Sequence, residues 1–95
     1  MNELSGIKAT VHGRVQGVFF RASTRKVARG LELSGTVRNL PGWNQVEVYA
    51  EGRKAQIEKL IGFLKTGPPG AKVEKVDVEW LGYTGEYTGF NVIYQ

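Results

Sequence analysis

The sequence predicts an α+β fold in which two helices cover one face of an antiparallel sheet, and three observations support that prediction. Short segments alternate apolar and polar residues with the period of two that is typical of half-buried strands. Two other segments place apolar residues three and four positions apart, which is typical of amphipathic helices. Stretches rich in glycine and proline separate these segments, so that they follow one another in the order strand, helix, strand, strand, helix, strand.

The first strand and the first helix follow one another directly. Residues 6–15 alternate strictly between apolar and polar side chains, which predicts a strand. Residues 21–31 then show helical spacing, because Arg21, Arg25 and Arg29 lie four positions apart. The residues of this helix that are expected to face inward are Val27, Ala28 and Leu31. The helix should end near Leu31.

The middle of the chain predicts a hairpin. Residues 36–39 follow Gly35 and begin with the β-branched pair Thr36 and Val37, which favours a short strand, and residues 46–51 alternate and return alongside it. The turn between them, residues 40–45, is longer than the tightest two-residue kind. Gly52 is expected to close this hairpin.

The last third of the chain predicts a helix and two strands. Residues 54–65 form an amphipathic helix because four apolar residues fall at positions i, i+3, i+4 and i+7. These four residues are Ile57, Leu60, Ile61 and Leu64. Residues 75–80 alternate as a fourth strand, and residues 90–94 predict a short fifth strand at the C-terminus. This β-α-β-β-α-β order matches the ferredoxin-like split βαβ sandwich.

Length and composition limit the classes of protein that this chain can represent. Its 95 residues suit one domain, expected over residues 1–95, and 41% hydrophobic residues are too many for a disordered chain. The chain has no cysteine, which excludes a disulfide framework, a cysteine-ligated metal and a thiol nucleophile. The first residues resemble no signal peptide, and no segment approaches the roughly 20 apolar residues of a membrane span. A cytoplasmic protein without a membrane partner is therefore expected.

Positive charge is concentrated in the first part of the chain. The net charge is +4, and residues 1–38 carry seven lysines and arginines against Glu3 and Glu32. Such a distribution suits an anionic ligand, either a small phosphate compound or a nucleic acid, and charge alone does not distinguish them. An ordinary solvated surface would give the same pattern.

The stretch from Gly13 to Arg21 is predicted to be an anion-binding loop, because it leaves a strand, turns at Gly17 and enters a basic helix. Glycine allows the positive φ of a tight turn, and amides at a helix N-terminus bind phosphate well. Arg21 adds a planar fork of donors that matches two phosphate oxygens. The alternative is an ordinary turn glycine followed by a solvated helix arginine.

Asn39 and His12 are the other polar residues that we considered. Asn39 ends the second predicted strand, which leads to the same edge as the first strand, so its side chain could face the loop and hold a water. It could equally start the turn that follows. His12, the only histidine, has no acidic partner in the loop and is assigned a structural or surface role. Because no acidic residue falls between Glu3 and Glu32, the loop contains no carboxylate nucleophile and no metal-binding carboxylate cluster.

The aromatic residues are mostly assigned to the core or to strands, with at least one ring of the loop expected in the core. They are Phe19, Phe20, Tyr49, Trp80, Tyr83, Tyr87, Phe90 and Tyr94. The aromatic and basic octapeptide of RNA-recognition modules is absent from residues 46–50. Trp43, in the turn, is either a contact residue or a cap on the hairpin.

Two motifs in this sequence resemble those of the acylphosphatases. Residues 13–21, Gly-Arg-Val-Gln-Gly-Val-Phe-Phe-Arg, are similar to the signature loop of that family, and residues 35–39 are similar to its second motif. The resemblance implies hydrolysis of small-molecule acyl phosphates without a metal or an organic cofactor. It also implies that Arg21 binds phosphate, that Asn39 orients the attacking water, and that main-chain amides form the phosphate cradle. The residues implied in phosphate binding are Gln16, Gly17, Val18, Phe19, Phe20 and Arg21.

Three positions depart from the pattern of that family. Thr36 replaces an aromatic residue, Glu32 replaces a glycine at the helix end, and residues 40–45 form a turn one residue longer with its glycine shifted. Substrate preference is the property that these changes bring into question. A basic module that binds nucleic acid, and a carbamoyl-phosphate-handling domain like those in larger maturation proteins, are the competing interpretations. We expect a free-standing, monomeric enzyme that does not bind nucleic acid.

Overall fold

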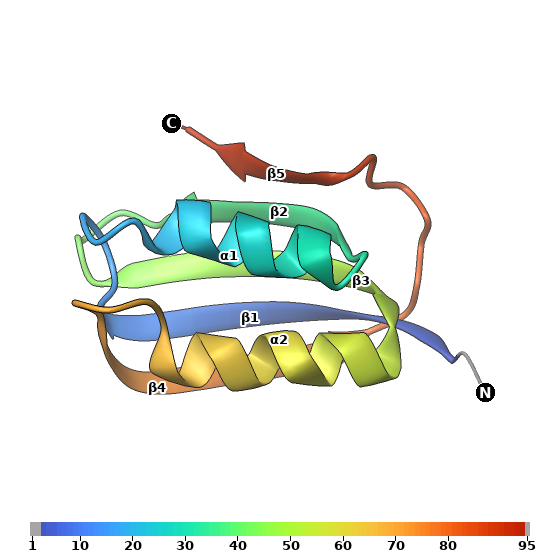
Figure 1. Cartoon of the computed structure of the whole chain (residues 1–95), viewed down its shortest axis with the longest axis horizontal. Coiled ribbons are helices and arrows are strands. Elements are labelled where there is room, and N and C mark those ends of the chain that lie inside the picture. The colour runs from blue at the N-terminus through green and yellow to red at the C-terminus, as the bar shows by residue number, and fades with distance from the viewer. Residues whose placement is uncertain (1–2, 95) are drawn as a thin grey trace.

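In the computed structural model, residues 3–94 form one sheet of five strands with two helices on one of its faces (Figure 1). The elements are β1 (Leu4–Arg14), α1 (Phe20–Gly30), β2 (Ser34–Asn39), β3 (Gln45–Arg53), α2 (Lys54–Thr66), β4 (Lys72–Leu81) and β5 (Phe90–Ile93). The predicted domain of residues 1–95 extends past this range, since Met1, Asn2 and Gln95 lie outside the described residues. Between residues 3 and 94, no helix combines the length and apolar character that crossing a membrane requires.

The strands lie in the order β4-β1-β3-β2-β5. The first four pair antiparallel, which confirms the predicted ferredoxin-like arrangement. The fifth strand pairs parallel to β2, so the complete sheet is mixed rather than antiparallel throughout. The cause is the loop after β4, which crosses from one edge of the sheet to the other and brings β5 in along the direction of β2 (Figure 1).

Two glycines that were expected to lie at strand boundaries, Gly35 before a strand and Gly52 after one, lie inside strands instead. Gly52 does not close the hairpin, because β3 continues through it and pairs it with Ser5. A Cβ atom on Gly52 would lie 2.6 Å from a methyl carbon of Leu33. A Cβ atom on Gly35, inside β2, would collide with the main-chain carbonyl of Tyr49. These glycines allow close packing of neighbouring chain segments, a role that a turn prediction does not detect.

The core lies between the helices and the sheet. Helix α2 buries Ile57, Leu60 and Leu64 completely, as its spacing predicts, whereas Ile61 is only partly buried. The core face of α1 agrees with the prediction at Ala28 and differs from it elsewhere. Its fully buried residues are Phe20, Thr24 and Ala28, and Val27 and Leu31 pack at the edge of the core.

The opposite face of the sheet buries two carboxylates. Glu47 is 8% exposed and accepts a hydrogen bond of 2.9 Å from Nε of Arg38. Glu51 is 5% exposed and accepts from the amide and hydroxyl of Thr84, at 3.0 and 2.7 Å, and from the amide of Gly85 at 3.0 Å. Glu51 therefore anchors the β4–β5 loop against the sheet, and that loop determines where β5 arrives.

Candidate active site

The segment between β1 and α1 turns through two residues with positive φ. Gly17 has φ +74°, as the loop prediction requires, and Phe19, directly before α1, has φ +59°. The first hydrogen bond of the helix joins the amide of Ser23 to the carbonyl of Phe19 at 2.9 Å. Figure 1 shows that this loop lies at the same end of the sheet as the turn between β2 and β3.

The amides of this segment are free. Across residues 3–94, the main-chain N–H groups of residues 16–22 donate no hydrogen bond to a protein acceptor. Helix α1 has no side-chain cap and no acidic residue in its first turn, although both are common at a helix N-terminus. Consecutive unpaired amides at the positive end of a helix dipole are a feature to which anions, phosphate among them, commonly bind.

Arg21, the second residue of α1, contacts an unexpected partner. Its guanidinium carbon lies 4.8 Å from the centre of the Tyr94 ring, and no carboxylate among the described residues pairs with it. Tyr94 follows β5 and is 73% exposed, so its assignment to the core or a strand is wrong. The parallel pairing of Arg38 with Ile93 explains its position, because the next residues of both strands emerge at the same end.

Asn39 is the last residue of β2. Its side-chain Oδ1 is buried and has no hydrogen-bond partner within the described part of the chain. A buried amide oxygen without a protein partner ordinarily accepts from a water. Asn39 lies in the wall of a cavity of about 280 Å³. The residues that line it are Val15, Gly17, Phe19, Phe20, Arg21, Ala22, Asn39 and Tyr94.

The structure thus brings most of the predicted site residues to one cavity. Asn39 faces the loop, as the strand order suggested, and shares the cavity with Gly17 and Arg21. Gln16 and Val18 do not line it. Sequence reasoning missed three lining residues, namely Val15, Ala22 and Tyr94. Val15 and Ala22 directly flank the predicted loop, whereas no local pattern indicates Tyr94, because only the pairing of β5 with β2 brings it here.

Gln16 instead holds the neighbouring turn in place. Its Nε2 donates hydrogen bonds of 2.9 Å to the main-chain oxygens of both Leu40 and Gln45. The amide of Leu40 donates to the same Gln45 oxygen at 3.0 Å and closes the turn. One side chain from the loop therefore fixes the turn that follows Asn39.

His12 lies outside the cavity and has a structural role, as expected. Its Nε2 lies 2.9 Å from Oδ2 of Asp77, and its Nδ1 lies 3.1 Å from Nε2 of Gln45. Within residues 3–94, no three His, Cys, Asp or Glu side chains gather closely enough to hold a metal ion.

The aromatic residues divide between the core and the surface. Phe20 is buried, with its ring centre 6.4 Å from that of Phe63, which confirms that one ring of the loop packs in the core. Phe19 is 83% exposed and Tyr83 is 47% exposed, so the core or strand assignment is wrong for both. Trp43, in the turn, is 85% exposed.

With this geometry described, comparison with known proteins identifies the family. A sequence model of the acylphosphatase family matches residues 7–92. The chain belongs to the acylphosphatase family. An acylphosphatase from Aeropyrum pernix is 50% identical over 84 residues, which cover 88% of this chain and 83% of that protein. An acylphosphatase from Acaryochloris marina is 48% identical over 87 residues, which cover 92% of this chain and 91% of that protein.

A solved acylphosphatase structure also superimposes on almost the whole chain. The structure from Coxiella burnetii has a TM-score of 0.89 and 42% sequence identity, and the match covers 97% of this chain and 94% of that one. Glu32 follows the end of α1. It adopts φ +60°, the left-handed conformation of a helix-ending glycine, and its amide bonds to the carbonyl of Arg29 at 3.0 Å. Thr36 pairs with Tyr49 and Asn91 inside the sheet and does not line the acylphosphatase cavity.

Proposed function

We propose that this protein hydrolyses the carboxyl–phosphate bond of small acyl phosphates, with the free amides of the 16–21 loop and Arg21 binding the phosphoryl group. One observation carries the proposal: a segment whose main-chain amides at residues 16–22 are unpaired lines one cavity together with Arg21 and with Asn39, whose Oδ1 is buried and unpartnered among the described residues. The amides and the guanidinium offer donors to the phosphoryl oxygens. The Asn39 oxygen accepts a hydrogen bond from a water.

The proposed reaction is an in-line displacement at phosphorus. The water held by Asn39 forms a new O–P bond while the bond between phosphorus and the acyl oxygen breaks. The carboxylate leaves with the bonding electron pair, and a phosphoryl oxygen of the substrate takes the proton of the water. Because a carboxylate is a good leaving group, positioning and charge stabilisation are the main requirements, and the loop contains no acidic residue to act as a base.

The protein's organisation belongs to the same proposal. Residues 1–95 would act as one monomeric domain in the cytoplasm, without a nucleic-acid partner. Sedimentation velocity, cell fractionation and retention on RNA or DNA at low salt check these properties.

The test is hydrolysis of benzoyl phosphate and acetyl phosphate in the presence of a chelator. Removal of one preorganised donor commonly costs about 100- to 1,000-fold, so Arg21→Ala and Asn39→Ala should each lower kcat/KM on that order. Arg25→Ala is the matched control, because it removes one positive charge from the same helix but not from the cavity. Asn91→Ala is the corresponding control for an exposed asparagine. Wild-type activity in both Arg21→Ala and Asn39→Ala would contradict the assignment.

A further inference from the structure

A second cavity of about 500 Å³ adjoins the candidate active site, because Asn39 lines both cavities. The other residues of the second cavity are Gln16, Arg38, Leu40, Pro41, Gly42 and Trp43. Nε2 of Gln16 is already engaged with two main-chain oxygens, and Nε of Arg38 with Glu47. Leu40, Pro41 and Trp43 supply the apolar part of the lining, which is somewhat larger than the polar part.

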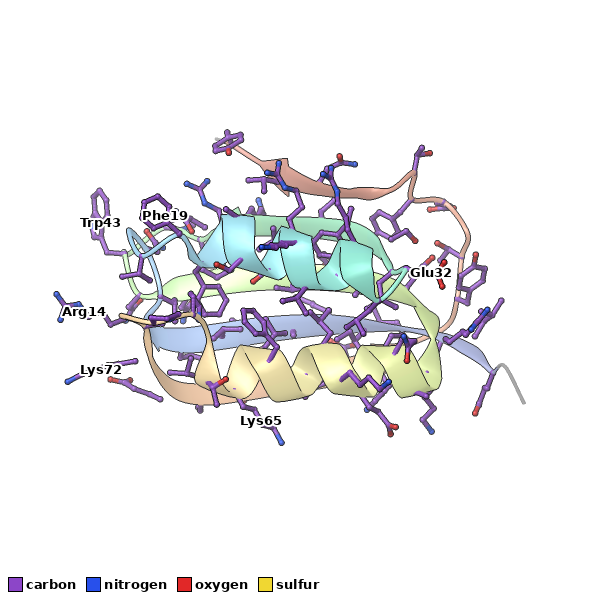
Figure 2. All side chains as sticks on the ribbon, in the orientation of Figure 1. Arg14, Phe19, Glu32, Trp43, Lys65 and Lys72 are labelled. Atoms are coloured by element: carbon purple, nitrogen blue, oxygen red, sulfur yellow. The ribbon has the colours of Figure 1, made fainter. Side chains whose placement is uncertain are left out.

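Trp43 is unusual in both its exposure and its backbone. It is 85% exposed and has φ +73°, a conformation that bulky side chains seldom adopt. Within residues 3–94 only three non-glycine residues have positive φ, namely Phe19, Glu32 and Trp43. Two of them, Phe19 and Trp43, are exposed aromatic residues at the same end of the molecule (Figure 2). Strained residues that gain no burial often contact a ligand.

The chemistry of the proposed substrate connects the two cavities. In an acyl phosphate a single oxygen joins phosphorus to the acyl carbon, so the acyl group lies directly beside the bound phosphoryl group. With the phosphoryl group against Arg21 and the free amides, an acyl group that passes Asn39 enters the second cavity. An aromatic or extended apolar group would cover the indole of Trp43, whereas a methyl group is too short to do so.

We propose that the second cavity is the acyl-group subsite and that Trp43 determines specificity by packing against the acyl group. The preferred substrates are then acyl phosphates with an aromatic or several-carbon acyl group, rather than acetyl phosphate. This inference rests on the proposed hydrolysis of acyl phosphates.

Trp43→Gly tests the subsite without adding strain, because glycine adopts positive φ freely. Loss of a packed aromatic contact typically changes an equilibrium about tenfold, so kcat/KM for benzoyl phosphate should fall about tenfold. The value for acetyl phosphate should stay within about twofold, since its methyl group gains little from the contact. Trp80→Ala is the matched control, because it removes the other tryptophan from a strand that lines neither cavity.

A binding experiment measures the same contact without turnover. In Trp80→Phe, Trp43 is the only tryptophan, so the emission of the protein reports on this ring alone. Benzylphosphonate, which is not hydrolysed, should change that emission, and methylphosphonate should not. Arg21→Ala should weaken the response to benzylphosphonate by removing the anchor of its phosphonate group.

The outcomes separate the subsite from the reaction. If the wild type hydrolyses both substrates and Trp43→Gly leaves their ratio unchanged, the subsite is wrong and the proposed function stands. If Phe19→Ala changes the ratio and Trp43→Gly does not, the acyl group lies against the phosphate loop, and the subsite is again wrong. If the wild type hydrolyses neither substrate, the proposed function fails and the subsite fails with it.

Discussion

The guanidinium of Arg21 stacks against the ring of Tyr94, with 4.8 Å between its central carbon and the ring centre. Arg21 is the second residue of α1, and Tyr94 follows the last strand of the sheet. The ring restricts the directions that the guanidinium can take while leaving its N–H donors free for the cavity that both residues line. The C-terminal strand thus contributes directly to the candidate active site.

Tyr94→Ala should slow hydrolysis modestly, because it removes this contact but leaves Arg21 in place. A cation–π contact at an exposed site is worth about 0.5–1 kcal/mol, which corresponds to a two- to fivefold loss in kcat/KM. Tyr94→Phe keeps the ring and should remain near the wild type. Steady-state kinetics on the three proteins checks this, and equal activity of Tyr94→Ala and Tyr94→Phe would exclude a positioning role for the ring.

Gln16→Ala should lower both stability and activity. It removes the two 2.9 Å hydrogen bonds that hold the turn after Asn39, and each is worth about 0.5–1.5 kcal/mol, so the free energy of unfolding should fall by about 1–3 kcal/mol. Denaturant unfolding measures this loss. Gln56→Ala is the control, because the Gln56 side chain makes no hydrogen bond with any of residues 3–94. If Gln16→Ala is no less stable than Gln56→Ala, the hydrogen bonds from Gln16 do not stabilise the turn.

Glu32→Gly should stabilise the protein by about 0.5–1 kcal/mol. It relieves a left-handed conformation at φ +60° and removes a negative charge from the C-terminal end of α1, where the helix dipole opposes it. Activity should not change, because Glu32 lies at the opposite end of the molecule from Phe19 and Trp43 (Figure 2). Glu58→Gly, the same substitution within helix α2, should instead cost about 1 kcal/mol. Thermal unfolding of both variants tests whether Glu32→Gly raises the free energy of unfolding while Glu58→Gly lowers it.

The Tyr87 phenol should make the protein less stable in alkaline solution. Burial raises the pKa of Tyr87 above its ordinary value of 10.0, and the nearby carboxylate of Glu51 raises it further. Because the folded protein holds this proton more tightly than the unfolded chain, the stabilisation is fully present below pH 10.0 and is lost as the pH rises through the folded-state pKa.

Tyr87→Phe should therefore show a shallower decline of unfolding free energy with pH above 10.0 than the wild type. Tyr83→Phe removes an exposed phenol from the same loop and serves as the control. Denaturant unfolding across this pH range gives the slopes, and identical slopes for Tyr87→Phe and the wild type would contradict the expectation.

Strongly periodic elements were predictable from the sequence almost to the residue. The predicted helix of residues 54–65 is Lys54–Thr66 in the structure, because one apolar stripe specifies both its face and its length. Strand ends were predicted less well. The prediction started β4 at residue 75, whereas the strand begins at Lys72. Its pairing with β1 continues past an irregularity of register between His12 and Gly13, which no alternation pattern shows.

The residues of the candidate site likewise divide into those that a local motif predicts and those that it does not. Gly17, Arg21 and Asn39 were recognisable because each belongs to a local motif whose residue types suit phosphate or water. Tyr94 and the side-chain role of Gln16 were not, since both depend on contacts between segments distant in sequence. The carboxylate of Glu51, which anchors the loop leading to β5, was hidden for the same reason.

The sequence by itself determined the two helices, the four antiparallel strands and the glycine turn of the loop that we propose binds phosphate, because these follow from local periodicity and from glycine at a turn before a basic helix. Only the tertiary structure decided the parallel pairing of β5, the stacking of Tyr94 on Arg21 and the exposure of Trp43. These features follow from where the β4–β5 loop crosses the sheet and how the 40–44 turn is held. Both are set by hydrogen bonds and packing between segments that the linear sequence does not place together.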